Sequence, residues 1–200
     1  MKKQPELREK TRKKIMDAFW EVYKNIRIEK ITVSSITKNA HLNRGTFYEY
    51  FNDVYDLLDQ IENDLLNEIA AWLASKVHKK EKIKFEEFAH ELSPFFFENN
   101  DKIFILLSER GDPSFQQKLR QKIKGSFADI LDLRKDSDEL EYLLTFIISS
   151  MSGIISYWHE TGQKTDSDEI LILMQALIAN GIHGYSQWNF GDSREKSSEH

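Results

Sequence analysis

The chain of 200 residues contains no cysteine, which excludes disulfide bonds, cysteine nucleophiles and thiolate metal sites. Proline and glycine are scarce, with 3 and 8 residues, and no run of alternating β-branched residues is present. These absences predict an almost entirely helical, all-α chain. No apolar run approaches the length of a membrane span and no signal peptide is recognisable, so we expect a soluble, cytoplasmic protein.

Motifs that carry catalysis or bind metals are also missing. The six histidines are scattered, with no His-x-x-x-His pair. There is no Walker loop, no dinucleotide fingerprint and no Gly-x-Ser-x-Gly elbow. The sequence therefore predicts no catalytic residue, no metal site and no cofactor, and it gives enzyme activity no support.

Positive charge is concentrated at the start of an acidic chain. The formal net charge is -5, yet residues 1–60 carry 12 basic and 9 acidic residues, a balance of +3, and residues 61–200 have a balance of -8. This asymmetry is typical of a small nucleic-acid reader attached to a larger body. The basic arm at residues 1–14 is either only solvated or touches DNA phosphates.

The stretch from Ile31 to Leu58, ITVSSITKNAHLNRGTFYEYFNDVYDLL, predicts two short helices joined by a tight turn. Thr32 is a favourable N-cap for the first helix. His41 interrupts the helical pattern, and Asn43 can cap a second helix from Arg44 to about Tyr50. Two such helices form a helix-turn-helix, whose second helix enters the DNA major groove.

These residues resemble a known family. NRGTFYEYF, preceded by TVSSITKNAHL and by the amphipathic TRKKIMDAFWEVY, resembles the DNA-binding domain of TetR-type transcriptional regulators over roughly Thr11 to Leu58. Two positions depart from the family pattern. His41 stands where the turn usually has glycine, which predicts a positive φ angle at a non-glycine residue. Val54 stands where a basic residue is usual, which puts one phosphate contact in doubt.

The motif and the resemblance together predict the DNA-binding residues. Arginine can donate two hydrogen bonds to guanine, so Arg44, with Thr46, is expected to contact base edges or the adjacent phosphate. Tyr48 and Tyr50 are expected to contact DNA phosphates. Thr32 and Ser34, at the start of the first helix of the motif, are expected to anchor the DNA backbone. The full predicted set is Thr32, Ser34, Asn43, Arg44, Gly45, Thr46, Tyr48 and Tyr50.

A long amphipathic helix is predicted from Asp53 to about Lys76. The resemblance implies that this helix joins the reader to the body and tilts when an effector binds; the alternative is a rigid strut. The predicted organisation is a three-helix DNA-binding domain with the helix-turn-helix at 1–52, a helical-bundle effector and dimerisation domain at 53–190, and a flexible tail at 191–200. LLSERGDPSFQQKL, in the body, resembles one branch of TetR-like proteins of Gram-positive bacteria.

Two apolar helices are predicted near the end of the chain, at about 138–160 and 167–188. Both carry more apolar surface than one side of a small bundle needs, so two of them from each subunit could form a four-helix homodimer interface, as the family does. The alternative is an ordinary buried hairpin. The body also holds large aromatic side chains that either fill the core or line an effector site, and the predicted ligand-binding set is Trp72, Phe88, Phe104, Tyr142, Phe146 and Trp158.

Two classes of function remain open from the sequence. The first is a DNA-binding regulator that binds a palindromic operator as a homodimer and is released by an unknown small molecule; repression is the usual mode of the resembled family. The second is a DNA-bound adaptor whose body contacts a partner protein. A closed apolar cavity in the body would favour the regulator, and a solid body the adaptor.

Overall fold

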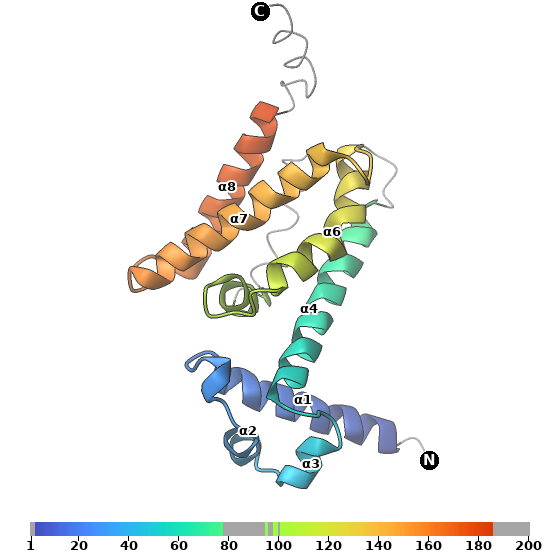
Figure 1. Cartoon of the computed structure of the whole chain (residues 1–200), viewed down its shortest axis with the longest axis vertical. Helices are drawn as coiled ribbons and strands as arrows, with labels where there is room; N and C mark the ends of the chain where they lie inside the picture. Colours follow the sequence, from blue (N-terminus) through green and yellow to red (C-terminus); the bar gives the residue numbers. More distant parts are fainter. Residues whose placement is uncertain (1–2, 78–94, 96–97, 100, 186–200) are drawn as a thin grey trace, which may run out of the picture. The chain divides into compact units, whose positions relative to one another are not determined.

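The computed structural model describes residues 3–77, 95, 98–99 and 101–185, and within them all regular structure is helical (Figure 1). The predicted all-α fold is confirmed. The chain forms two compact units, Met1–Asn67 and Glu68–His200. Their boundary falls inside the long helix α4 (Val54–Val77), whereas the sequence-based division lies one residue before this helix.

The first unit packs four helices around one aromatic core. Helix α1 (Lys3–Tyr23) contacts α2 (Val33–Asn39), which contacts α3 (Arg44–Tyr48), and a 3-10 turn (Ile28–Lys30) links α1 to α2 (Figure 1). The side chains that are fully or almost fully buried come from α1, α2, α3, the loop after α3 and the start of α4: Ile15, Phe19, Tyr23, Ile36, Phe47, Phe51 and Leu57. Burial of these large apolar groups is the main stabilising term for so small a unit.

Both short helices of the motif begin at side-chain caps, as predicted. The Thr32 hydroxyl accepts a hydrogen bond from the backbone N–H of Ser35, whose own hydroxyl accepts one from the backbone N–H of Thr32, so a capping box starts α2. The side-chain oxygen of Asn43 accepts from the backbone N–H of Thr46 at 2.7 Å and starts α3. Capping matters here because helices of seven and five residues do not persist in isolation.

The turn between α2 and α3 explains the histidine at the family's glycine position. His41 has a φ angle of 50°, so the predicted positive φ is confirmed. The backbone N–H of Leu42 bonds the carbonyl of Thr37 at 2.9 Å, and that of His41 bonds the carbonyl of Lys38 at 3.2 Å. These two bonds form a Schellman motif, which ends α2 and directs the chain toward the start of α3.

The second unit contains α6 (Phe115–Leu131), α7 (Asp138–Glu160) and α8 (Ser167–Tyr185), and residues 101–107 are also helical. Helix α7 contacts both α6 and α8. The turn before α6 requires glycine at position 111, because a Cβ atom there would lie 2.2 Å from the carbonyl oxygen of Leu106. Helix α7 begins at a side-chain cap, since the Ser137 hydroxyl accepts a hydrogen bond from the backbone N–H of Leu140.

One helix among the described residues, α7, is long and apolar enough to cross a bilayer by length and composition. The expectation that no segment approaches the length of a membrane span is therefore wrong for α7. One such helix is weak evidence for a membrane segment, because core helices of soluble proteins meet the same criterion. The side chains of Leu140, Leu144, Ile148 and Ile155 are almost fully buried in the unit, as in a core helix.

Candidate DNA-binding surface and ligand cavity

The eight predicted DNA-binding residues lie in α2, α3 and the adjoining loops. Thr32 and Asn43 also cap helices, because their side-chain oxygens accept hydrogen bonds from backbone N–H groups at the starts of α2 and α3. Six of the eight are exposed, and Thr46 and Tyr50 are half-buried. Arg44 is exposed in the first turn of α3, and Tyr48 is 52% exposed at its end. On the opposite side of α3, Phe47 is 0% exposed and packs into the core of the unit.

A basic side chain of α1 extends this surface. The guanidinium of Arg8 lies 5.8 Å from the centre of the Tyr50 ring, a distance at which a cation and an aromatic face attract each other. Tyr50 is predicted to contact phosphate, and Arg8 places a permanent positive charge beside it. The sequence does not single out Arg8, because its proximity to Tyr50 depends on how α1 packs on the motif.

The first turn of α4 carries no cation at the position where the resembled family has one. Val54 is buried there, and the carboxylate of Asp53 accepts hydrogen bonds from the backbone N–H groups of Tyr55 and Asp56, each at 2.8 Å. A carboxylate at this helix start repels phosphate. The exposed basic residues beside the motif include Arg8 and Arg44.

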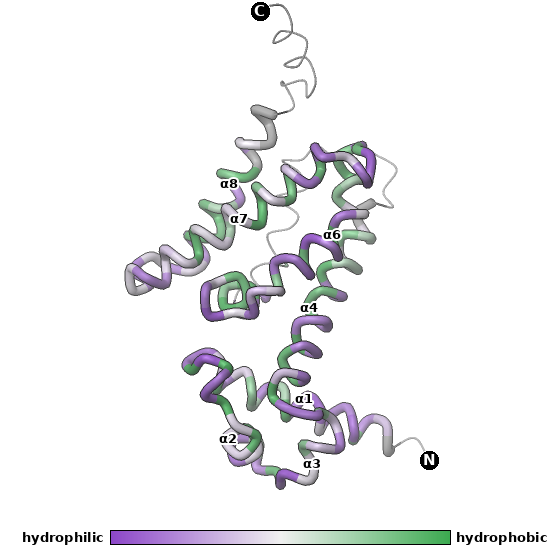
Figure 2. The backbone as a smooth tube through the Cα atoms, viewed as in Figure 1, coloured by the Kyte–Doolittle hydropathy of each residue, from purple (hydrophilic) through white to green (hydrophobic). Residues whose placement is uncertain are grey.

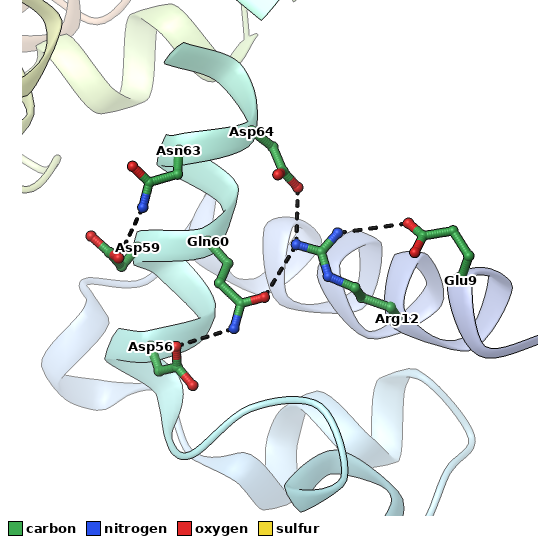
Figure 3. Close-up of polar contacts among 7 residues, drawn as sticks. All are labelled: Glu9, Arg12, Asp56, Asp59, Gln60, Asn63 and Asp64. Carbon is green, nitrogen blue, oxygen red and sulfur yellow. Dashed lines mark hydrogen bonds and ion pairs between the residues drawn. The ribbon is translucent and has the colours of Figure 1, made fainter. Parts of the chain in front are cut away.

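A row of polar side chains runs along the side of α4 and joins it to α1 (Figure 3). The carboxylate of Asp56 accepts hydrogen bonds from the backbone and side chain of Asn52, at 2.7 and 3.0 Å, and from the amide of Gln60 at 3.1 Å. These donors, led by the Asn52 backbone N–H, lower the pKa of Asp56, so it is ionised at neutral pH. The guanidinium of Arg12 then donates to the Gln60 oxygen and to the Asp64 carboxylate, both at 3.1 Å.

The second unit contains an apolar cavity of about 90 Å³. Its wall is formed by α6, α7, α8, the helical segment 101–107, Phe95 and the last part of α4. Among the described residues of that wall, Gln175 of α8 is the one polar side chain. The remaining lining residues are Ile69, Leu73, Phe95, Ile103, Leu107, Phe115, Leu119, Ile123, Phe127, Ile147, Ile148, Met151, Leu171, Met174 and Ile178.

Five of the six predicted ligand-binding residues are described, and none of these five lines this cavity. Phe104 is buried and packs edge-on against Trp158, with ring centres 5.1 Å apart, and the indole N–H of Trp158 donates to the carbonyl of Thr165. Trp72 packs near Phe95, with ring centres 6.0 Å apart. Tyr142 and Phe146 are 67% and 49% exposed on α7. Phe88 lies outside the described residues.

The sequence does carry a signal for part of the cavity wall. Phe115, Leu119, Ile123 and Phe127 recur every four residues along α6, and all four line the cavity. This spacing indicates one apolar stripe on the helix. It does not show which stripe faces a cavity and which a filled core, because that depends on the helices packed opposite.

Helices α7 and α8 also carry apolar side chains that the single chain leaves exposed. They are Tyr142, Phe146, Tyr157, Ile172, Leu173 and Leu177, each about half or more exposed. Figure 2 shows hydrophobic positions recurring along both helices. The ring of Phe146 approaches α8 at Gly181, where an added Cβ would lie 3.4 Å from it, so the exposed residues of the two helices adjoin. We call this set the α7–α8 face.

The described part of the chain shows no group of three or more His, Asp or Glu side chains placed to hold a metal ion. What the structure shows is a capped helix-turn-helix with an exposed polar side and, in a separate helical unit, an apolar cavity. This combination defines a helix-turn-helix protein with an attached helical body.

Comparison with known proteins gives one family match. A TetR-type family model, described as a transcriptional regulator C-terminal region, matches residues 84–180. This match, the N-terminal motif and the fold all agree with the TetR family of transcriptional regulators. No curated protein sequence matches the chain significantly.

Three solved structures illustrate the shared fold. A TetR transcriptional regulator from Streptococcus agalactiae is 23% identical with a TM-score of 0.57, covering 88% of this chain and 97% of that one. FadR from Bacillus subtilis in complex with stearoyl-CoA is 20% identical with a TM-score of 0.60, covering 84% and 97%. SmeT, the repressor of a Stenotrophomonas maltophilia multidrug efflux pump, is 15% identical with a TM-score of 0.65, covering 85% and 89%.

Proposed function

We propose that this cytoplasmic protein is a repressor that binds a palindromic operator as a homodimer and is released by a small apolar effector. The observation that carries the proposal is the reading helix α3. Asn43 caps this helix, and its Phe47 side chain is buried in the core. Arg44 and Tyr48 are exposed to solvent. Its exposed residues are of the types that read base edges and phosphates in the major groove.

DNA selection tests this proposal directly. The wild-type protein is incubated with a pool of random-sequence duplexes, and bound molecules are recovered and sequenced; we call the preferred sequence the selected duplex. A dimer should select two inverted half-sites about 34–36 Å apart, one helical turn, or a multiple of that spacing. Arg44→Ala should lose about 1–3 kcal/mol on the selected duplex and relax the preference at one base pair. Recovery of no enriched sequence would contradict the proposal.

The homodimer is proposed to form through the α7–α8 face. Regulators of this family act as dimers, and this face exposes six large apolar side chains on two adjacent helices. Such a patch is unfavourable in water and is suited to a second copy of the same chain, which presents an identical apolar surface.

Leu177→Lys is expected to break this dimer without unfolding the chain. Leu177 is 52% exposed, so a lysine remains hydrated in the monomer, but it would be buried without a partner in a symmetric interface. Burying an unpaired charge costs several kcal/mol, so the dimer dissociation constant should rise by at least about 100-fold. Sedimentation at micromolar concentration checks the mass, and circular dichroism checks the fold. A dimer of unchanged affinity would exclude this face.

The cavity supports the effector over the protein-adaptor alternative. Its volume of about 90 Å³ is below the roughly 300–1,000 Å³ of pockets that enclose a whole drug-sized ligand. We therefore propose that it takes the hydrocarbon part of an effector. The proposal agrees with the stearoyl-CoA bound by FadR from Bacillus subtilis, a protein that shares this fold.

Matched neutral and anionic probes test the chemistry of the cavity. Among the described residues that line it, none is charged and Gln175 is the one polar group, so an ionised carboxylate inside would be desolvated without a counter-charge from them. We expect 1-octanol to bind at least about tenfold more tightly than octanoate at pH 7, a difference of about 1.4 kcal/mol. Isothermal calorimetry on the full-length protein measures both. Tighter binding of octanoate would show that its carboxylate is not desolvated in the cavity, and it would contradict this prediction.

A further inference from the structure

The polar row on α4 has a regular spacing. Asp56, Gln60 and Asp64 are each four residues apart in α4, and on a helix residues at this spacing lie above one another on one side. Asn52, in the loop before the helix, is four residues before Asp56. Hydrogen bonds join Asn52 to Asp56 and Asp56 to Gln60. Between Gln60 and Asp64 the connection is made by Arg12 of α1 (Figure 3). We call these five residues the Arg12 ladder.

Each inner member of the ladder is held from two sides. The amide of Gln60 donates from its nitrogen to Asp56 and accepts at its oxygen from Arg12, so its orientation is set by both partners. The same guanidinium nitrogen of Arg12 donates to Gln60 and Asp64, while its other terminal nitrogen lies 3.7 Å from the Glu9 carboxylate. The Arg12 side chain is 24% exposed, which makes this more than a fully solvated surface pair.

The first member of the ladder adjoins the reading helix. Asn52 follows Phe51, whose ring is buried and lies 5.6 Å from that of Phe47 in α3. The backbone N–H of Asn52 donates to Asp56 at 2.7 Å, so the connection from α3 to α4 is tied to the same row that Arg12 joins to α1. One hydrogen-bonded path therefore links the loop after α3, the side of α4 and the middle of α1.

We propose that Arg12 is a positioning residue for the reading helix: it locks α1 to the first three turns of α4, from Val54 to Asp64. These turns of α4 then move together with α1, α2 and α3 as one rigid unit, and any bend of α4 that an effector causes lies beyond Asp64. The statement about effectors rests on the proposed function. The locking of α1 to α4 stands on the ladder alone.

Arg8 provides a matched control one helical turn before Arg12. Both are arginines of α1, so replacing either by methionine removes the same charge and leaves a long apolar side chain. Arg8 is exposed beside Tyr50, where it can meet a DNA phosphate, whereas Arg12 is directed to Gln60 and Asp64. A direct phosphate contact and a positioning role differ in their salt dependence, because only the contact releases a counterion.

The first experiment measures affinity for the selected duplex and for the unselected random pool over a range of salt concentrations. Arg12→Met should weaken the selected duplex about tenfold, with the salt slope unchanged and the random pool bound as before. Arg8→Met should reduce the salt slope by about 0.9 on both DNAs. Asp64→Ala should resemble Arg12→Met, and the double variant should be no weaker than Arg12→Met alone. An unchanged affinity, or a slope reduced as in Arg8→Met, would overturn the proposal.

The second experiment needs no DNA. Because the chain has no cysteine, spin labels can be attached specifically at Lys13→Cys in α1 and Asn63→Cys in α4, two exposed positions, the second of which lies within the locked turns. The labelled protein is diluted with unlabelled protein so that pairs within one chain dominate. Arg12→Met should broaden the distance distribution and Arg8→Met should not; equal widths would refute the locking. If no duplex is ever selected, the proposed function fails, yet this measurement still decides the role of Arg12.

Discussion

Phe47→Ala is expected to lower the free energy of unfolding of the first unit by about 3–5 kcal/mol, the range for truncating a buried phenylalanine. Phe47 is 0% exposed, and its ring lies 5.6 Å from that of Phe51. Because α3 has only five residues, this side chain is its main anchor in the core. Thermal unfolding followed by circular dichroism should show an earlier transition, and binding to the selected duplex should be lost even where the second unit remains folded.

The neighbouring residue supplies the control. Tyr48 is 52% exposed, so Tyr48→Phe removes one hydroxyl from the surface and should change stability by less than about 0.5 kcal/mol. Its effect should fall on DNA instead, weakening the selected duplex and the random pool about equally, because a phosphate contact carries no sequence information. Equal destabilisation by both variants would mean that α3 is not anchored through Phe47.

Local features of the motif could be predicted because neighbouring residues determine them. A threonine or asparagine can cap a helix by accepting a hydrogen bond from the backbone N–H three residues later, and Thr32 and Asn43 do so. The positive φ angle of His41 follows from a turn that must end one helix and begin another within four residues. The all-helical class follows in the same way from helical periodicity and the scarcity of proline and glycine.

Contacts between distant segments could not be predicted. The bonds from Arg12 reach across 48 and 52 residues of sequence, and nothing in TRKKIMDAFWEVY distinguishes Arg12 from the exposed Lys13 beside it. The described members of the predicted ligand-binding set lie away from the cavity wall for a related reason. Size and aromaticity marked Tyr142 and Phe146, but the packing of α7 against α6 and α8 leaves both exposed. The wall is aliphatic for the most part, a composition that any helical core shares.

Met174→Phe is expected to give a protein that binds DNA but no longer responds to an apolar effector. Met174 of α8 is 2% exposed and lines the cavity, and a bulkier ring there should narrow the roughly 90 Å³ of free space and, being stiffer than methionine, should not move aside for a ligand. Affinity for 1-octanol should fall at least about 100-fold, a loss of about 2.7 kcal/mol. Overpacking a filled core usually costs about 1–3 kcal/mol, but here the existing void should absorb most of the added volume.

The volume-conserving Met174→Leu separates cavity filling from any other effect at this position, since leucine keeps the void and should retain octanol binding within a few-fold. The two variants are compared by calorimetry with octanol and by binding to the selected duplex with and without octanol. Linkage requires that a ligand which weakens DNA binding be weakened by DNA to the same extent. Wild type and Met174→Leu should therefore show reciprocal shifts, and Met174→Phe should show neither. If Met174→Phe still releases DNA when octanol is added, the effector acts from a site other than this cavity.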